Sequence, residues 1–422
     1  MKNIIEQDIK KREEDLVNKW ASINKMVTVN ESQFAFEKEN NFKNFINNQF
    51  KTDQELKSYN FYRNEWFRRA KEFDPGNAPL SVTIELVSTC NLGCSMCYTI
   101  TEEFENSVVG SVRMLPWPIV KSVIDECADI GVYSILFSWR GESTLYKQKL
   151  QNGKYMDFCD VLKYANSKKI LEISSLTHGQ GLDENFINKL IDAQPNWISF
   201  SIDGLFEDYN KIRTPKNKKG NNQYNAFEEV IKSIKLINKI KKEKKSLRPQ
   251  IRTNTIFPAI SKYPYKYRDF MYENGVDWIT VNEILDFRSE NIDESEIKKN
   301  WACQYPFQRL TVAANGTILP CTGAHNEEHD LNLGQYINSP EKKIKINDEY
   351  ITIKNNQTTL LGAWNSKKLN NIRKLHMENK RCELKNGCRN CRHGMKKMGA
   401  TYVPEDWDGE NMIWKNHDFG HG

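Results

Sequence analysis

The chain has 422 residues, of which 39% are hydrophobic and 27% charged, and its formal net charge is +6. These values are typical of a folded globular protein and exclude a largely disordered chain. No apolar run approaches the roughly 20 residues that cross a bilayer, and the charged start of the chain lacks the apolar core of a secretory signal. We therefore expect a cytoplasmic protein that does not associate with a membrane.

The positive charge does not predict a nucleic-acid surface. Its excess lies in a loop over residues 211–219 and in residues 232–248, where isoleucines recur every three residues and leave the lysines on the solvated face of a helix. No aromatic residues interleave with these lysines, as they do on single-stranded nucleic-acid surfaces. Nucleic acid is therefore not an expected partner.

Residues 1–76 have the composition of a polar helical extension without alternating strands, and they end at an Asp-Pro-Gly turn. Short β-branched runs then alternate with amphipathic stretches, which indicates βα units and a parallel sheet. The expected strands cover residues 82–87, 132–139, 170–175, 197–202, 250–256 and 278–283, and the expected helices cover 117–130, 156–167, 184–193, 226–242 and 264–275.

Six βα units are too few to close an eight-stranded barrel, so residues 77–297 are expected to form an open, partial barrel. Its active site should lie at the carboxyl ends of the strands. The alternation stops near residue 298, which predicts a small separate domain over residues 298–400. Residues 401–422 form a tail without an assigned role.

The ten cysteines are grouped in a way that indicates metal chemistry, since a cytoplasmic chain keeps its thiols reduced. Cys90, Cys94 and Cys97 follow the first expected strand with the spacing C-x3-C-x2-C. Three thiolates can bind three irons of a four-iron cluster and leave the fourth iron open. Structural zinc needs four ligands, and no fourth Cys or His lies in this loop.

With this cysteine loop, the chain resembles the radical SAM superfamily over roughly residues 80–285. The resemblance implies a [4Fe-4S] cluster that binds S-adenosylmethionine (SAM), an external electron donor such as flavodoxin or ferredoxin, and cleavage of SAM to a 5′-deoxyadenosyl radical that abstracts hydrogen from a substrate. The family usually places an adenine-contacting aromatic residue just before the third cysteine. Here that position is Met96, and Tyr98 is the candidate to replace the aromatic ring.

Three further segments resemble the SAM pocket of this family. Gly141-Glu142 is similar to the motif that receives the methionine ammonium, and Ser201 and Asp203 are similar to the ribose-binding segment. Arg213 resembles the arginine that pairs with the methionine carboxylate. All three segments follow the ends of expected strands.

The later cysteines resemble the SPASM and twitch extensions, which carry auxiliary iron–sulfur clusters. Two all-cysteine clusters would need eight thiols and only five are present, so we expect one auxiliary [4Fe-4S] cluster. Its ligands are expected to be Cys303, Cys321, Cys388 and Cys391, with Cys382 as competitor for one of the last two. The alternative is a zinc knuckle of Cys382, Cys388, Cys391 and His393. Cys127 and Cys159, on expected helices, are interpreted as buried inert thiols.

The expected architecture is therefore α/β: a partial (β/α)6 TIM barrel with an N-terminal helical extension and a small C-terminal cysteine-rich iron–sulfur domain. Pocket candidates at the strand ends are His178, Arg252, Asn254, Asn282 and Glu283. Glu283 could act as a general base or sit in a structural ion pair.

The substrate is expected to be a small molecule, with a carbohydrate favoured, and the reaction a dehydrogenation or epimerisation by an oxidoreductase. A ribosomal peptide is the alternative, disfavoured because residues 1–76 show no strands of a leader-binding module. An alternative of another class is a non-catalytic iron–sulfur or RNA-binding protein that has kept the fold.

Overall fold

A computed structural model of the protein describes residues 26–30, 33–36, 41–106, 112–216, 224–282, 294–299, 301–353, 356–384 and 387–394. Its main feature is one sheet of 12 strands in the order β1-β2-β10-β9-β8-β7-β4-β3-β11-β12-β13-β16. The six central strands run parallel. They are β3 (Ser81–Ile84), β4 (Ser134–Leu136), β7 (Glu172–Thr177), β8 (Trp197–Ser201), β9 (Gln250–Ile256) and β10 (Trp278–Asn282). The predicted partial (β/α)6 barrel is thereby confirmed.

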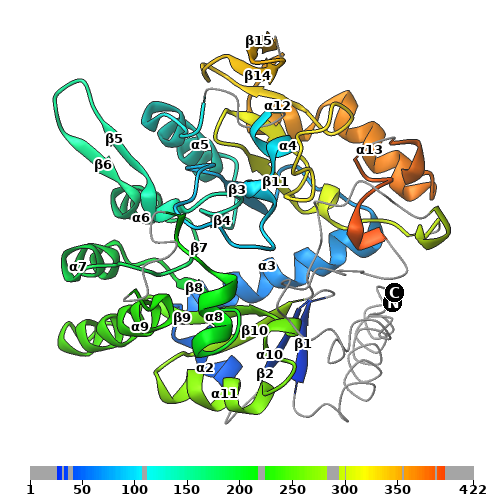
Figure 1. Ribbon diagram of the computed structural model, residues 1–422. Coiled ribbons are helices and arrows are strands. Elements are labelled where there is room, and N and C mark those ends of the chain that lie inside the picture. Colours follow the sequence, from blue (N-terminus) through cyan, green and yellow to red (C-terminus); the bar gives the residue numbers. More distant parts are fainter. Residues whose placement is uncertain are drawn as a thin grey trace.

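Helices follow the parallel strands and cover the outside of the barrel (Figure 1). They are α5 (Trp117–Asp129), α6 (Phe158–Ser167), α7 (Glu184–Ala193), α9 (Ala226–Glu243) and α11 (Pro264–Glu273). In α9, Ile234 and Ile237 are fully buried while Lys232 and Lys235 are exposed, as the three-residue repeat predicted. Cys127 on α5 and Cys159 on α6 are buried at 0% and 2% exposure, in agreement with their interpretation as inert thiols.

The amino-terminal end of the barrel is closed by α3 (Asp53–Glu72) and the segment before it. The ring of Tyr62 stacks on Tyr133, just before β4, at 5.5 Å. Gln308, just before β11, donates a hydrogen bond from Nε2 to Trp66 O (2.6 Å). Figure 1 shows α3 lying across the barrel. The carboxyl ends of the strands are therefore left for the functional site.

The expectation that residues 1–76 contain no strands is wrong. β1 (Met26–Asn30) and β2 (Gln33–Phe36) form a hairpin, and β2 pairs antiparallel with β10. The two runs, Met-Val-Thr-Val-Asn and Gln-Phe-Ala-Phe, are only five and four residues long and do not alternate regularly, which is a weak signal inside a polar segment. The remaining helices near this end are α2 (Asn41–Asn47) and α3.

The cysteine-rich region continues the barrel's sheet past the predicted boundary at residue 298. β11 (Arg309–Val312) pairs parallel with β3, and β12 (Thr317–Leu319) returns antiparallel after a turn in which Gly316 has φ +84°. The region also contains β13 (Gly334–Tyr336), β14 (Lys342–Ile346), β15 (Glu349–Ile353), β16 (Gln357–Thr358), α12 (Leu360–Trp364) and α13 (Lys367–Met377).

The short elements complete the chain. They are α4 (Glu102–Phe104), β5 (Lys147–Lys149), β6 (Tyr155–Asp157), α8 (Phe206–Ile212), α10 (Phe257–Ile260) and the 3-10 turns η1 (Tyr98–Ile100), η3 (Ser143–Leu145), η5 (Glu294–Glu296), η6 (Tyr305–Phe307), η7 (Arg381–Glu383) and η8 (Arg392–Gly394). Among the described residues, no helix is both long and apolar enough to span a bilayer. The predicted tail, residues 401–422, lies outside the part of the chain that the structure describes.

Candidate active site

The first cysteine loop leaves β3 at the carboxyl end of the barrel. Cys94 is 6% exposed, and Cys90 and Cys97 are half-buried. Burial raises the pKa of Cys90 to about 11 and that of Cys94 to about 12. Three thiolates can exist together in such a place only beside compensating positive charge, and iron supplies that charge. The donor set therefore fits a four-iron cluster in which three irons take one thiolate each and the fourth iron has no protein ligand.

Gly141 lies directly against the segment that leads into the cysteine loop. A Cβ atom at this position would be 2.2 Å from Val87 O and 2.6 Å from Thr89 O, so only glycine fits. The next residue, Glu142, donates its backbone N–H to Thr89 O at 2.9 Å. The Gly-Glu segment and the cysteine loop thus form one packed unit.

The carboxylate of Glu142 is 4% exposed and is held by neutral donors. Its Oε1 accepts hydrogen bonds from Thr177 Oγ1 (2.8 Å) and Thr144 Oγ1 (2.7 Å), and its Oε2 accepts one from His178 N (2.9 Å). No Lys or Arg of the described residues forms an ion pair with it. A buried carboxylate in this state is a fitting partner for a ligand ammonium.

Arg213 joins the cysteine loop to the end of β8. Its Nε and Nη2 donate to Asp203 Oδ2 at 2.7 and 2.6 Å, while its Nη1 lies 4.0 Å from Cys94 Sγ. Asp203 is fixed in turn by the Ile256 N–H, which donates to Oδ1 at 2.9 Å. The carboxylate of Asp203 therefore orients the guanidinium, and the resemblance to a carboxylate-binding arginine is compatible with this geometry.

The other predicted pocket residues lie in different surroundings. Tyr98 is 7% exposed, its ring lies 4.7 Å from that of His325, and its hydroxyl donates a hydrogen bond to Asn326. The Tyr98 ring is thus used at the contact with the cysteine-rich region, and an adenine contact stays a prediction. Ser201 ends β8, half-buried, opposite Asn254. Glu283 lies outside the described residues.

Arg252 is not at the substrate end of the barrel. Its Nε donates to Ser199 Oγ at 3.1 Å, and its guanidinium lies 4.1 Å from the ring of Trp197, at the start of β8. The expectation of a pocket role is corrected, because this side chain packs near the start of β8, away from the carboxyl ends of the strands. Asn254, two residues further along β9, accepts hydrogen bonds from Thr280 (3.0 Å) and Asn282 at the other end of the strands.

Four of the five later cysteines surround one small cavity. Cys303, Cys321, Cys388 and Cys391 all line it, and Cys382 does not. Burial raises the pKa of all four thiols. Gly323 leaves room between two of them, since a Cβ there would lie 3.5 Å from Cys321 Sγ and 3.9 Å from Cys391 Sγ. The thiols and the space among them fit an iron–sulfur cluster.

Two side chains that contact the loop or the thiol of Cys388 carried no signal in the sequence. Arg381 is fully buried and holds the loop of the last two cysteines, donating to Cys388 O and to Gly394 O (2.7 Å). His376, on α13, lies 3.3 Å from Cys388 Sγ through its Nε2. These contacts of the His376 ring and the Arg381 guanidinium become visible only in the folded structure.

A buried charge network connects the two cysteine sites. Arg140, beside Gly141, donates to Glu85 Oε2 (2.6 Å) at the end of β3 and to Glu327 Oε1 (3.0 Å) in the cysteine-rich region. Lys342 also pairs with Glu327. Trp139 Nε1 donates to Thr322 O, next to Cys321, at 3.0 Å. The loop over residues 139–142 thus touches both sites.

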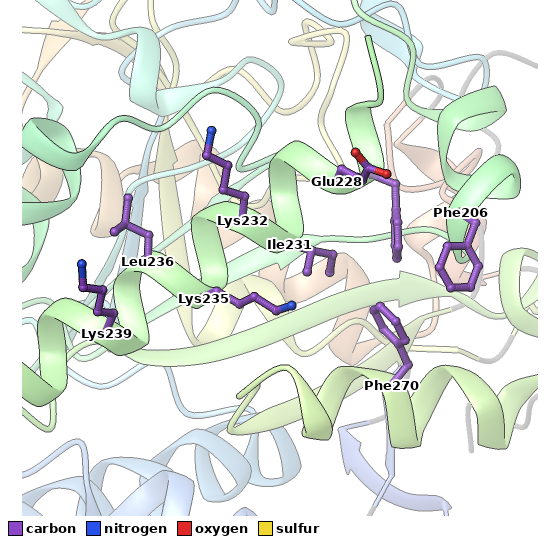
Figure 2. Close-up of a pocket in the computed structure, with 9 residues that line it drawn as sticks. Phe206, Glu228, Ile231, Lys232, Lys235, Leu236, Lys239 and Phe270 are labelled. Carbon is purple, nitrogen blue, oxygen red and sulfur yellow. The ribbon is translucent and has the colours of Figure 1, made fainter. Parts of the chain in front are cut away.

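An open apolar groove lies elsewhere. It is formed on the outer surface by α8, α9 and α11, as Figure 2 shows, and its floor includes Phe206, Ile231 and Phe270 with Lys232 and Lys235 at its edge. None of the predicted site residues lines it. The chemistry is therefore assigned to the two cysteine sites rather than to this groove.

Comparison with known proteins agrees with this assignment. Residues 84–255 match the model of the radical SAM superfamily, and residues 303–392 match that of SPASM, an iron–sulfur cluster-binding domain. The chain is a radical SAM superfamily enzyme, and it carries a C-terminal SPASM domain. Its cofactors are accordingly a SAM-binding [4Fe-4S] cluster, an auxiliary iron–sulfur cluster and SAM. The match to SPASM favours an auxiliary iron–sulfur cluster over the alternative zinc knuckle.

Individual relatives are distant. The Fe-coproporphyrin III synthase of Methanosarcina barkeri is 29% identical over 147 residues, which are 34% of this chain and 32% of that protein, so the match spans about a third of the relative. Among solved structures, BtrN with AdoMet and 2-DOIA is 14% identical (TM-score 0.41, 74% of this chain and 92% of that one). SuiB of Streptococcus suis with precursor peptide SuiA is 15% identical (TM-score 0.48, 74% and 70%). Native anSMEcpe with bound AdoMet is also 15% identical (TM-score 0.48, 75% and 89%).

Proposed function

We propose that this enzyme abstracts hydrogen from a small polar molecule, such as a carbohydrate, and dehydrogenates or epimerises it. The observation that carries the proposal is the loop over residues 139–142. Its Glu142 N–H binds the cysteine loop at Thr89 O (2.9 Å), and its Trp139 indole binds Thr322 O (3.0 Å) beside Cys321. A second site bonded so directly to the SAM site suits a reaction that needs two redox centres.

In this proposal Cys90, Cys94 and Cys97 hold the first cluster, and Cys303, Cys321, Cys388 and Cys391 hold the second. When bound, the first cluster supplies the electron that cleaves SAM to a 5′-deoxyadenosyl radical, and the second supplies a one-electron acceptor. An external electron donor such as flavodoxin or ferredoxin would reduce the enzyme.

The chain's own side chains bind and orient SAM. The buried carboxylate of Glu142 would accept the methionine ammonium, and the guanidinium of Arg213 would pair with the methionine carboxylate. Asp203 holds Arg213 in place through its 2.6 Å ion pair. Ser201 would contact the ribose. Because these groups sit on a rigid barrel, they restrict SAM to one geometry before the reaction begins.

Polar side chains at the ends of β9 and β10 support a hydroxylated substrate. Asn254 Oδ1 accepts hydrogen bonds from Thr280 and Asn282, and all three lie within the barrel's sheet near its carboxyl end. The amide groups of Asn254 and Asn282 have further donor and acceptor capacity that the hydroxyl groups of a sugar could use, whereas apolar side chains of a peptide could not.

A peptide substrate is the second candidate. The strands β1 and β2 remove the argument against it, and β1 is the last strand of the sheet as described. A terminal strand offers free backbone groups to which an extended peptide can add.

Deuterium transfer would identify the substrate class. Protein reconstituted anaerobically and reduced with dithionite is incubated with SAM and with deuterated sugars, amino sugars or peptides, and 5′-deoxyadenosine is analysed by mass spectrometry. We expect deuterium from a sugar, no product with Cys94→Ala, and normal product with Cys127→Ala, which removes a buried thiol outside both sites. Deuterium only from peptides would favour the second candidate. No 5′-deoxyadenosine above the Cys94→Ala level would favour a non-catalytic iron–sulfur or RNA-binding protein.

A further inference from the structure

We infer that His376 is a positioning residue of the auxiliary site: its Nε2–H donates a hydrogen bond to the Cys388 thiolate and raises the reduction potential of the cluster bound there. The inference rests on the proposed function in one respect, since it takes Cys388 as a cluster ligand.

The tautomer of His376 follows from its two contacts. The backbone N–H of Cys303 points at Nδ1 over 3.1 Å, and an N–H group can only donate. Nδ1 is therefore the acceptor and carries no proton, so the proton of the neutral ring is on Nε2. Nε2 lies 3.3 Å from Cys388 Sγ. A cluster-bound thiolate has no proton to give and can only accept this one.

The ring is held rigidly between the two cysteines. His376 is fully buried near the end of α13, and Arg373, one turn earlier, fixes the same helix by donating from Nε to Pro306 O (2.9 Å) and from Nη1 to Trp364 O (2.8 Å). His376 and Arg373 both project from α13. Through them this helix binds the segment 303–306 at its first residue and at its last. Such a contact keeps its geometry in both oxidation states, because no part of it is free to rotate toward solvent.

A donor at this place acts on the reduced cluster more than on the oxidised one. Reduction adds one negative charge that is shared by the ligand sulfurs, and a hydrogen bond to sulfur stabilises the more negative state. A cluster with a higher potential accepts an electron more readily, which is what an oxidation of substrate requires of the second site. His376 would thus raise the reduction potential of the auxiliary cluster, in the direction that the proposed oxidation of substrate requires.

The test uses a chain without the first cluster, Cys90→Ala/Cys94→Ala/Cys97→Ala, so that only the auxiliary cluster is titrated. Three substitutions separate the two contacts of the ring. His376→Gln places an amide donor near the former Nε2 position, His376→Asn retains only an acceptor for Cys303 N–H, and His376→Leu removes both. The exposed His329, changed to Asn, is the matched control. The reduction potential is measured by a redox titration followed by electron paramagnetic resonance.

We expect His376→Asn and His376→Leu to disfavour reduction about tenfold, which is a potential about 59 mV more negative for one electron. His376→Gln and His329→Asn should stay near the parent value. Parent potentials in the Asn and Leu variants would overturn the inference. So would loss of iron from all three variants with unchanged circular dichroism, because His376 would then serve cluster binding rather than its potential. A parent chain with no iron at all would instead contradict the cluster assignment in the proposed function.

Discussion

Replacing Arg140 with leucine should destabilise the protein strongly, because Arg140 is the only charge that bridges Glu85 and Glu327 in the described network. The side chain is 4% exposed and both carboxylates are 0% exposed. The substitution removes contacts of 2.6 and 2.8 Å to Glu85 and of 3.0 Å to Glu327. Glu85 then keeps a hydrogen bond from Ala314 N (2.9 Å) but no cation.

A buried carboxylate that loses its partner costs about 3–5 kcal/mol. We therefore expect Arg140→Leu to lower the free energy of unfolding by about that amount in urea titrations followed by circular dichroism. Arg113→Leu is the matched control, because its 2.8 Å pair with Glu105 is exposed, at 38% and 63%, and such pairs contribute about 0–1 kcal/mol.

The double variant Arg140→Leu/Glu85→Gln tests the cause. Since glutamine leaves no unpaired charge, it should recover part of the loss. If Arg140→Leu stayed within about 1 kcal/mol of Arg113→Leu, the network would not stabilise the fold as its burial requires.

Three further predictions concern the sites. Gly141→Ala should abolish SAM-dependent 5′-deoxyadenosine formation, because its Cβ would meet Val87 O at 2.2 Å, whereas Gly93→Ala, with its nearest atom at 3.5 Å, should keep it; equal activities would contradict the packing argument. Cys321→Ser should reduce the iron content from about eight to about four per chain and Cys382→Ser should not, as measured by iron analysis. Burial would raise the pKa of Glu327, but Lys342 and Arg140 outweigh it and hold the pKa low. The resulting stabilisation of the fold is fully present above the pKa that Glu327 has in the unfolded chain. It should be lost as the pH falls through the lower pKa of Glu327 in the folded protein, which urea titrations between about pH 3 and 7 would detect.

Much of the barrel could be predicted because its strands and helices obey simple periods. The helix over residues 184–193 and the strand over residues 250–256 were predicted with the bounds that the structure has. Both are bounded by turn residues and bury a regular face, so local sequence determines them. The three cysteines and the Gly-Glu pair could be found since their spacing is itself the signal.

What the sequence could not supply are contacts between distant segments. His376 lies 73 residues from Cys303 and its helix has an ordinary composition, so nothing local marks its ring as a bridge. Arg140 is adjacent to a motif, but its partner Glu327 is 187 residues away. Which neighbours the Arg252 side chain contacts depends on the register of β9 against β8. The strands β1 and β2 form a part of the sheet because β2 pairs with the edge of β10.

The register between β3 and β11 explains why the segments that lead to the two cysteine sites lie side by side. Ile84 pairs with Val312, so Glu85 and the turn after β11 leave the sheet side by side, and the Ala314 N–H donates to Glu85 at 2.9 Å. The segment after β3 continues to Cys90, and the segment after β11 returns through β12 to Cys321. The separation of the two sites is thus determined by a parallel strand pair and fixed by a buried ion network. Because interiors this densely packed do not deform gradually, a change at Arg140 should disturb SAM binding and the auxiliary cluster together.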